Sequence, residues 1–315
     1  MSEELPQEHP APPEAGTLTR CRRESQEELT EIGQLLVGDG RLVDDDVAVS
    51  IYTDRGPVNA DKDKNQDFIL AWRPFRASGP RAIQFVVAIA DGVSSSLYAE
   101  WASEVACWTS ARALVANRES LSAVDLAHRV FDRAGACIGS LADEITADSL
   151  LFRPKGEFDA TWGYRLRKGR LAQTTLLLAW IDQEGLHVAS VGDAGAVCRV
   201  TAEGISGGSP VDYLVAACDL ETSLVNALGP QQRAIRQFDS WFEAPIGAQT
   251  LLAAYTDGIA RGLGAEPLAL LDNLEALLED RFEHPSHCYT RQVIEQRPDE
   301  HDDNLTLGVL LYKAQ

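Results

Sequence analysis

The feature that most constrains the fold is a set of β-rich apolar segments that come in two groups, each followed by helical stretches. The first group consists of VAVSIY at 47–52, DFILAW at 67–72 and AIQFVVAIA at 82–90. Polar turns separate these segments, and short runs rich in Val, Ile and aromatic residues indicate β-strands. After them, apolar residues recur at intervals of three and four over 97–115 and 124–141, which predicts two helices with core-facing sides.

The second group of strands begins with TTLLLAWI and LHVASV, which residues 182–185 join as a predicted hairpin. AGAVCRV, QTLLAAYT and the final LTLGVLLY follow, with a helix before QTLLAAYT and another near 265–280. Two batches of strands with helices after each favour antiparallel sheets that pack on each other under helical layers. The sequence therefore predicts one α+β domain.

The N-terminal part of the chain has a different composition. Residues 1 to about 20 are rich in Pro, Glu and Ala and are expected to be disordered, because they offer little apolar surface to bury. Ser25 and Glu28 form a capping-box pattern that predicts a short helix over 25–37, and 38–46 has the turn chemistry of a linker. We therefore expect an acidic, largely disordered segment at 1–46 and a folded domain at 47–315.

The overall charge argues against a protein that coats nucleic acid. Lys and Arg number 28 against 48 Asp and Glu, and a formal charge of −20 would repel a phosphate backbone. The N-terminus lacks the basic and apolar regions of a signal peptide, and no apolar run approaches the ~20 residues of a membrane span. The six cysteines form no CxxC motif, which favours free thiols in a reducing compartment and a cytoplasmic location.

Aspartates recur where predicted strands begin or end. They are Asp67, Asp91, Asp193, Asp257 and Asp303. One such carboxylate is usually a turn former, but stacked sheets would bring several of them to one rim, where they repel unless cations neutralise them. Hard oxygen ligands select Mg²⁺, Mn²⁺ or Ca²⁺ over zinc, and a pair of such ions commonly serves phosphoryl hydrolysis.

Two other metal interpretations are weaker. DKDKNQD at 61–67 begins like an EF-hand loop, but Gln66 and Trp72 stand where that loop needs Gly and a bidentate Glu. His284, His287 and Cys288 lack the second ligand pair of a structural zinc site, so a surface turn is the favoured interpretation.

The order of the motifs resembles a known family. VVAIADG, QTTLLLAW, VASVGDAGAV, VNALG, LLAAYTDG and DDNLTLGVLL look like successive signatures of the PP2C-type (PPM family) metal-dependent Ser/Thr protein phosphatases, in a bacterial-like and divergent form. YTDRGPVN…NQD looks like the family's opening motif, and the resemblance spans about residues 47 to 312. It implies a four-layer αββα sandwich, two antiparallel sheets flanked by helices, with a metal site at one end.

The resemblance also implies a site and a reaction. A water bridging two Mn²⁺ or Mg²⁺ ions would hydrolyse phosphoserine or phosphothreonine in a protein substrate, opposing a cognate Ser/Thr kinase in signalling. Asp91 would bridge both ions, with the carbonyl of Gly92 on one of them and Asp257 and Asp303 on the other. Asp67 would lie at the edge of the second ion, and Asp193 matches a position that contributes to a third, weaker ion.

Departures from the family's pattern leave a second interpretation open. Lys62 stands where an Arg normally grips the substrate phosphate, and Gln66 replaces a Glu. Lys binds phosphate as a point charge without the bidentate fork of Arg. The alternative to an active phosphatase is therefore a catalytically weak or inactive pseudophosphatase that acts as a regulatory binding module.

Overall fold

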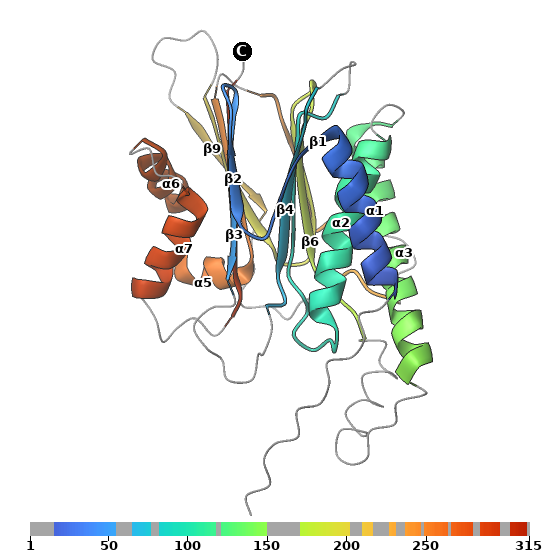
Figure 1. Ribbon diagram of the computed structural model, residues 1–315. Coiled ribbons are helices and arrows are strands. Elements are labelled where there is room, and N and C mark those ends of the chain that lie inside the picture. The colour runs from blue at the N-terminus through green and yellow to red at the C-terminus, as the bar shows by residue number, and fades with distance from the viewer. Residues whose placement is uncertain are drawn as a thin grey trace, which may run out of the picture.

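The computed structural model describes residues 16–54, 65–76, 82–117, 121–149, 171–201, 210–216, 227–230, 237–246, 249–263, 266–279, 284–296 and 303–313. Within these ranges the chain forms four layers, with two sheets face to face and helices on the outer side of each (Figure 1). Both sheets are antiparallel throughout. The α+β class and the αββα arrangement predicted above are confirmed.

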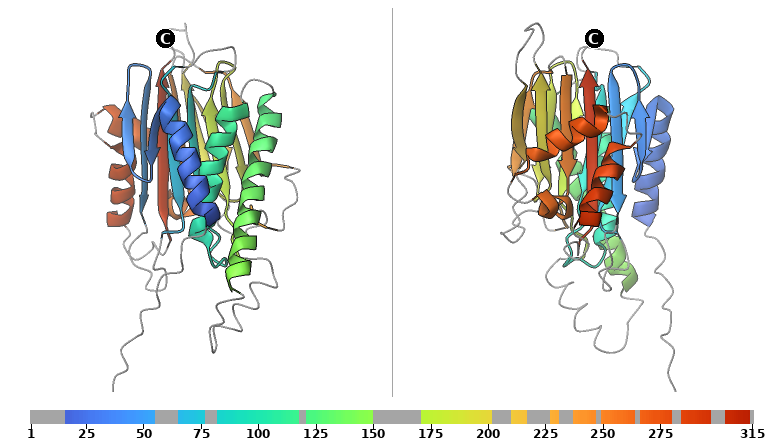
Figure 2. Two further views of the ribbon diagram at one scale, coloured as in Figure 1. Left: turned by 45° about the vertical axis from the view of Figure 1, so that its right-hand side comes forward. Right: turned by 90° about the vertical axis from the view of Figure 1, so that its left-hand side faces the viewer.

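The first sheet has the strand order β1-β4-β5-β6-β7-β10. Its strands are β1 (Gly33–Val37), β4 (Phe68–Pro74), β5 (Phe85–Ala90), β6 (Leu176–Ile181), β7 (Leu186–Val191) and β10 (Ser240–Ala244). Three helices cover its outer face (Figure 2, left): α1 (Gly16–Ile32), α2 (Ala99–Asn117) and α3 (Ala123–Ser149). The predicted hairpin through 182–185 joins β6 to β7.

The second sheet has the order β2-β3-β12-β11-β8-β9. Its strands are β2 (Gly40–Val43), β3 (Val47–Asp54), β12 (Leu305–Lys313), β11 (Gln249–Tyr255), β8 (Gly195–Thr201) and β9 (Val211–Ala216). Its outer face carries α5 (Asp257–Leu263), α6 (Ala269–Glu279) and α7 (Pro285–Gln296) (Figure 2, right). None of the described helices is long and apolar enough to cross a membrane.

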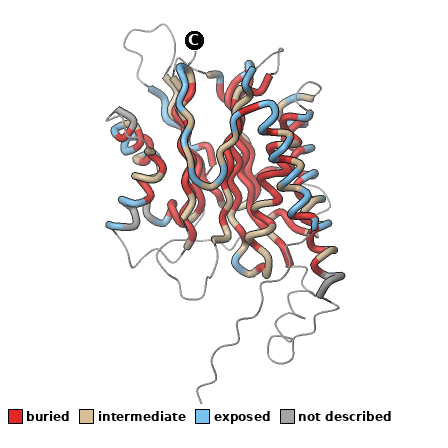
Figure 3. Tube along the Cα trace, in the orientation of Figure 1, coloured by how far each residue is buried: buried red, intermediate tan, exposed pale blue. Residues whose placement is uncertain are grey.

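Three hydrophobic clusters fill the spaces between the four layers. Strand β5 shows how one segment serves two of them: Val86 and Ala88 pack toward the helices, whereas Val87 and Ile89 pack toward the other sheet. Because both faces are buried, the strand is an unbroken apolar run rather than an alternating one. Figure 3 shows the buried residues concentrated in the sheets and on the inner sides of the helices.

The expectations for the N-terminal segment are wrong in their details. Helix α1 begins at Gly16, inside the stretch expected to be disordered, and Ser25 is buried in mid-helix instead of capping it. Residues 33–37, expected to be helical, pair with β4 as strand β1, and β2 lies within the expected linker. Pairing with β4 thus outweighs the local helical spacing of these residues. The indole of Trp72 on β4 also bonds to the end of α1, where it donates to the carbonyl of Leu29 at 2.9 Å.

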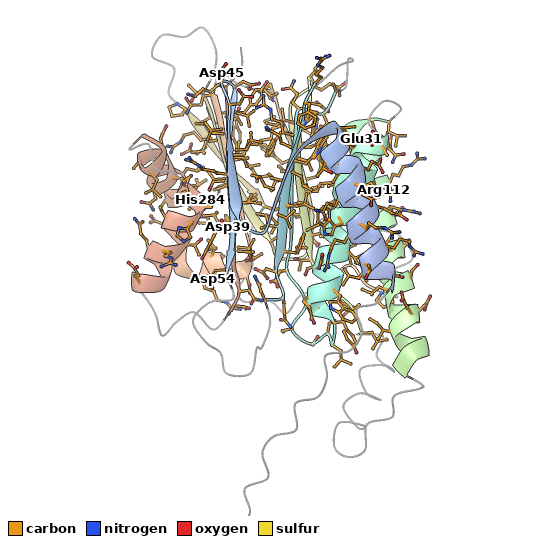
Figure 4. The ribbon with its side chains drawn as sticks, viewed as in Figure 1. Glu31, Asp39, Asp45, Asp54, Arg112 and His284 are labelled. Carbon is orange, nitrogen blue, oxygen red and sulfur yellow. The ribbon has the colours of Figure 1, made fainter. Side chains whose placement is uncertain are left out.

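The C-terminal half also holds elements that the sequence did not predict. Strands β9 and β10 extend the two sheets, and α7 begins at Pro285, where a surface turn was expected. His284 precedes that helix, and its Nδ1 lies 2.9 Å from the hydroxyl of Ser50 on β3. Its Nε2 lies 2.9 Å from a carboxylate oxygen of Asp39, which Figure 4 shows beside it. The described cysteines are free, as expected, and Cys218 lies outside the described residues.

A buried ion pair closes the β6–β7 hairpin. His187 on β7 places Nε2 3.1 Å from Asp182 and Nδ1 3.2 Å from Glu243 of β10. Burial opposes the charged imidazole, but the two carboxylates outweigh it and raise the pKa of His187. Burial likewise opposes the charge of Asp182, and its bond to His187 brings the pKa of Asp182 below its usual range.

We expect His187→Gln to lower the free energy of unfolding by about 1–3 kcal/mol at pH 5.5 and by less at pH 8.5. A raised folded-state pKa gives stability that is complete below the unfolded value of about 6.5 and is lost as pH rises through the folded value. Urea denaturation at both pH values measures the difference, with Glu243→Gln as a control for the more exposed partner. An equal loss at both pH values would show that folding leaves the pKa of His187 unchanged and would contradict this account.

Candidate functional site

A pocket with a cavity volume of ≈ 130 Å³ opens at the end of the sandwich where strands of both sheets terminate. It is lined by Asp91, Gly92, Val93, Ser94, Thr175, Asp193, Asp257, Arg261 and Asp303. Asp54 marks the same end of β3 in Figure 4, because it pairs with Leu305 at the start of β12. The pocket therefore lies at the rim where the sequence predicted its aspartates to meet.

Strand ends position each of these aspartates. Asp91 follows β5, Asp257 follows β11 at the first residue of α5, Asp193 lies in the turn between β7 and β8, and Asp67 and Asp303 come just before β4 and β12. The strands are antiparallel, so an ending strand and a starting neighbour meet at one rim. Four of the predicted metal ligands line the pocket together with Gly92, and Asp67 lies beside it.

Asp67 is buried and is held by two threonines. Its Oδ2 accepts the hydroxyl hydrogens of Thr256 and Thr306, each at 2.8 Å, whereas its buried Oδ1 has no hydrogen-bond donor. Burial raises the pKa of Asp67 to about 6, although the neighbouring Asp91 carboxyl and then the two hydroxyl groups favour the ionised form. One oxygen of this carboxylate is thus fixed, and the other is left for a proton or a cation.

Asp91 is fixed through its backbone. Its carbonyl accepts the amide hydrogen of Thr175 and the hydroxyl hydrogen of Thr174, both at 2.8 Å. Its own amide donates to the hydroxyl of Thr175 at 3.1 Å. Burial, and then the neighbouring carboxylates of Asp67 and Asp257, raise the pKa of Asp91 well above its usual range. The main chain of Asp91 is thus held in place, and the residue lines the pocket.

Gly92 and Gly258 are required by close backbone approaches. A Cβ on Gly92 would lie 2.8 Å from both the carbonyl oxygen of Gln66 and the backbone of Ala99. A Cβ on Gly258 would lie 1.9 Å from the carbonyl oxygen of Asn304. In each Asp-Gly pair, the glycine allows the chain to lie close to a neighbouring segment while the aspartate stays at the rim.

A single arginine pairs with two of the acidic groups. Nη2 of Arg261 lies 2.7 Å from Oδ2 of Asp257 and 3.2 Å from Oδ2 of Asp303. Burial, and then the charge of Asp303, raise the pKa of Asp257 to about 7, against the opposing effect of Arg261. Burial also raises the pKa of Asp193. The described pocket lining thus contains four carboxyl groups and one guanidinium, which pairs with two of them.

The donor set fits a divalent cation. No group of three or more described His, Cys, Asp or Glu side chains is arranged to hold a metal as it stands, and Arg261 already engages two of the carboxylates. Asp67 and Asp257 nevertheless each keep a buried Oδ1 without a hydrogen-bond donor. Such oxygens are costly unless a proton or a cation satisfies them, and carboxylates and carbonyls suit Mg²⁺ or Mn²⁺.

Sequence reasoning missed three contributors to this site: Arg261, Thr256 and Thr306. Arg261 lies four residues after Asp257, and this spacing on the helix that begins there would have indicated the ion pair. The two threonines follow from no local pattern, since only the pairing of β11 with β12 brings them to Asp67.

The opening motif is described only in part. Lys62, the candidate for the substrate phosphate, lies outside the described residues. Asn65 donates to the hydroxyl of Thr53 at 2.8 Å, and its Oδ1 accepts the amide hydrogen of Asp67 at 3.0 Å. Strand β4 begins at Phe68, where an EF-hand loop would still have to curl around calcium. Asn65 thus anchors the start of β4 and orients Asp67.

Comparison with solved structures supports the fold. A serine-threonine phosphatase 2C from Toxoplasma gondii aligns with a TM-score of 0.58 and 12% identity over 90% of this chain and 100% of its own. PppA of Pseudomonas aeruginosa, described as a key regulatory component of T6SS, gives 0.53 and 14% over 86% and 99%. The catalytic domain of the phosphatase PstP, in complex with 2 manganese ions, gives 0.52 and 14% over 85% and 99%.

Comparison at the level of sequence supports the family. No curated protein sequence matches the chain. Residues 59–296, however, match the family model described as Protein phosphatase 2C, and that range contains Asp67, Asp91 and Asp257. The matched range is well over half of the 315 residues. The fold is an αββα sandwich, and the motifs that form its acidic rim follow one another in the family's order. This chain belongs to the protein phosphatase 2C family of serine/threonine protein phosphatases.

Proposed function

We propose that the protein hydrolyses phosphoserine and phosphothreonine in a phosphorylated protein substrate, with two Mn²⁺ or Mg²⁺ ions bound at the acidic rim. The observation that carries the proposal is the concentration of four carboxylates in one small pocket, with the buried Asp67 beside it. Asp67 and Asp257 each keep an oxygen that has no donor. A structural role would not need so many like charges together, because each raises the cost of ionising the next. A kinase acting on the same substrate would supply the phosphate ester.

The expected ligands follow from the positions of the side chains. Asp91 would contact both ions, Gly92 would contribute its carbonyl, and Asp257 and Asp303 would bind from the other sheet, with Asp67 at the edge. Bound there, the ions would supply a water with its pKa lowered toward about 7 and would neutralise the phosphate. Asp193, the remaining carboxylate of the described pocket lining, stands where the family resemblance implies a third, weaker ion.

The protein's own residues would mainly position these groups. Thr256 and Thr306 hold Asp67 in a fixed orientation, and Thr174 and Thr175 hold the main chain of Asp91. The described residues that line the pocket include neither Cys nor His, and we assign its aspartates, which could otherwise act as nucleophiles, to metal binding. Direct attack by water is therefore the reaction that the pocket supports best. Lys62 is our candidate for binding the substrate phosphate.

Asp91→Asn should abolish most of the Mn²⁺-dependent hydrolysis of a phosphothreonine peptide. Loss of residues that merely orient metal ligands lowers metal affinity or activity about 10–100-fold. Loss of the bridging ligand should therefore lower kcat/KM by at least about 100-fold. Asp45→Asn is the matched control, because Asp45 is exposed at the far end of the sandwich (Figure 4). Activity that survives Asp91→Asn would contradict the proposed metal-dependent mechanism.

Thr306→Val should weaken Mn²⁺ binding and lower stability by about 1–3 kcal/mol, because it removes a donor from a buried carboxylate. Thr306→Ser keeps the hydroxyl group and should retain most of both properties. Calorimetric titration with Mn²⁺ and urea denaturation of both variants provide the comparison. If the Val and Ser variants bound Mn²⁺ equally well, the bond to Asp67 would have no role in positioning it.

A regulatory binding module is the second candidate, and Gln66 is the observation that favours it. Gln66 brings a neutral amide next to Asp67, and its Oε1 is buried without a hydrogen-bond partner. Hydrolysis of p-nitrophenyl phosphate and of the phosphothreonine peptide with Mn²⁺ separates the two candidates. If the wild-type protein binds Mn²⁺ but hydrolyses neither substrate, the binding module is the better description.

A further inference from the structure

Arg261 is the one cationic side chain among the described residues that line the acidic pocket. It belongs to α5, one helical turn after Asp257, and reaches back to the carboxylates of Asp257 and Asp303. The side chain of Arg261 is 39% exposed, whereas those of Asp257 and Asp303 are 14% and 17% exposed. The guanidinium therefore covers two largely buried acidic groups from the solvent side.

Its charge lies against two of the four carboxylates of the described pocket lining, those of Asp257 and Asp303. A guanidinium is permanently charged, and its planar fork can serve two carboxylates at once. Arg261 is thus a built-in cation paired with Asp257 and Asp303, in a pocket that Asp193 also lines.

The same volume cannot hold both this guanidinium and a metal ion. Nη2 lies 2.7 Å from Oδ2 of Asp257, and a divalent cation on that oxygen would lie at about 2.0–2.6 Å. Two positive groups at such distances from one oxygen would overlap and repel each other. The Oδ1 of Asp257 is buried without a hydrogen-bond donor and stays available to an ion.

We propose that Arg261 is a positioning residue that serves as a permanent counter-ion to Asp257 and Asp303 and excludes a third divalent cation from the space between these residues and Asp193. This inference rests on the proposed function, because it requires the acidic rim to bind two divalent ions. The guanidinium also holds Asp257 and Asp303 side by side before any ion is bound. The site is thereby limited to two ions and is partly neutralised without them.

Equilibrium dialysis against ⁵⁴Mn²⁺ tests the proposal on the full chain at fixed ionic strength. We expect about two ions per chain for the wild type and about three for Arg261→Ala, with the added ion the weakest. Arg261→Lys keeps a charge without the fork and should bind fewer ions than Arg261→Ala. Adding Asp193→Asn to Arg261→Ala should remove the third ion and leave the other two.

Thermal unfolding in EDTA provides a readout that is independent of metal. Arg261→Ala should unfold at a lower temperature than the wild type, because Asp257 and Asp303 then repel each other without a counter-ion. Arg261→Ala with wild-type stoichiometry would overturn the role of Arg261 but leave the proposed function intact. If neither protein bound Mn²⁺, the proposed function would fail, and this inference with it.

Discussion

Repulsion among buried carboxylates is the constraint on which the rest of this structure depends. Asp91 interacts with Asp67, Asp257 and Asp303 in a pocket where burial alone already disfavours charge. A loose chain would separate these groups or expose them to water. The stability of two packed sheets, with hydrophobic clusters on both sides of each, is what holds them together.

The architecture concentrates these charges through its strand ends. In an antiparallel sandwich, segments far apart in sequence stop and start at one rim, so that carboxylates from both sheets meet without any long loop. Short bonds then hold each group: hydroxyl donors on Asp67, backbone bonds on Asp91 and a guanidinium on Asp257. These three kinds of interaction differ, and each leaves at least part of the acidic surface available to a ligand.

The strands that form the middle of each sheet were predictable because they are buried on both faces and read as long apolar runs. The meeting of the aspartates was predictable for the same reason, since each flanks one of those runs. Strands β1 and β2 were missed because they lie at sheet edges, where β1 carries the Leu35 and Leu36 spacing that also suits a helix. Helix α7 was missed because its sequence, PSHCYTRQVIEQ, has few apolar residues.

The interactions around the site are harder to predict from the sequence than the site residues, because these interactions depend on tertiary structure. The donor from Thr306 to Asp67 spans 239 positions in sequence, and no local pattern predicts it. Arg261 was within reach of sequence reasoning, since a basic residue one turn after an acidic one is a recognisable helix pair. What the sequence could not indicate is that this pair would form inside the acidic pocket.

The central claim is that the acidic rim binds two divalent cations and that Arg261 excludes a third. Crystals grown with Mn²⁺ and measured at the manganese absorption edge test it most directly. The account predicts about two anomalous peaks, in contact with Asp91 and with Asp257 or Asp303, and none between Asp193 and Asp257. An absence of peaks at the rim, or a peak at the position of the Arg261 guanidinium in the wild-type protein, would contradict it.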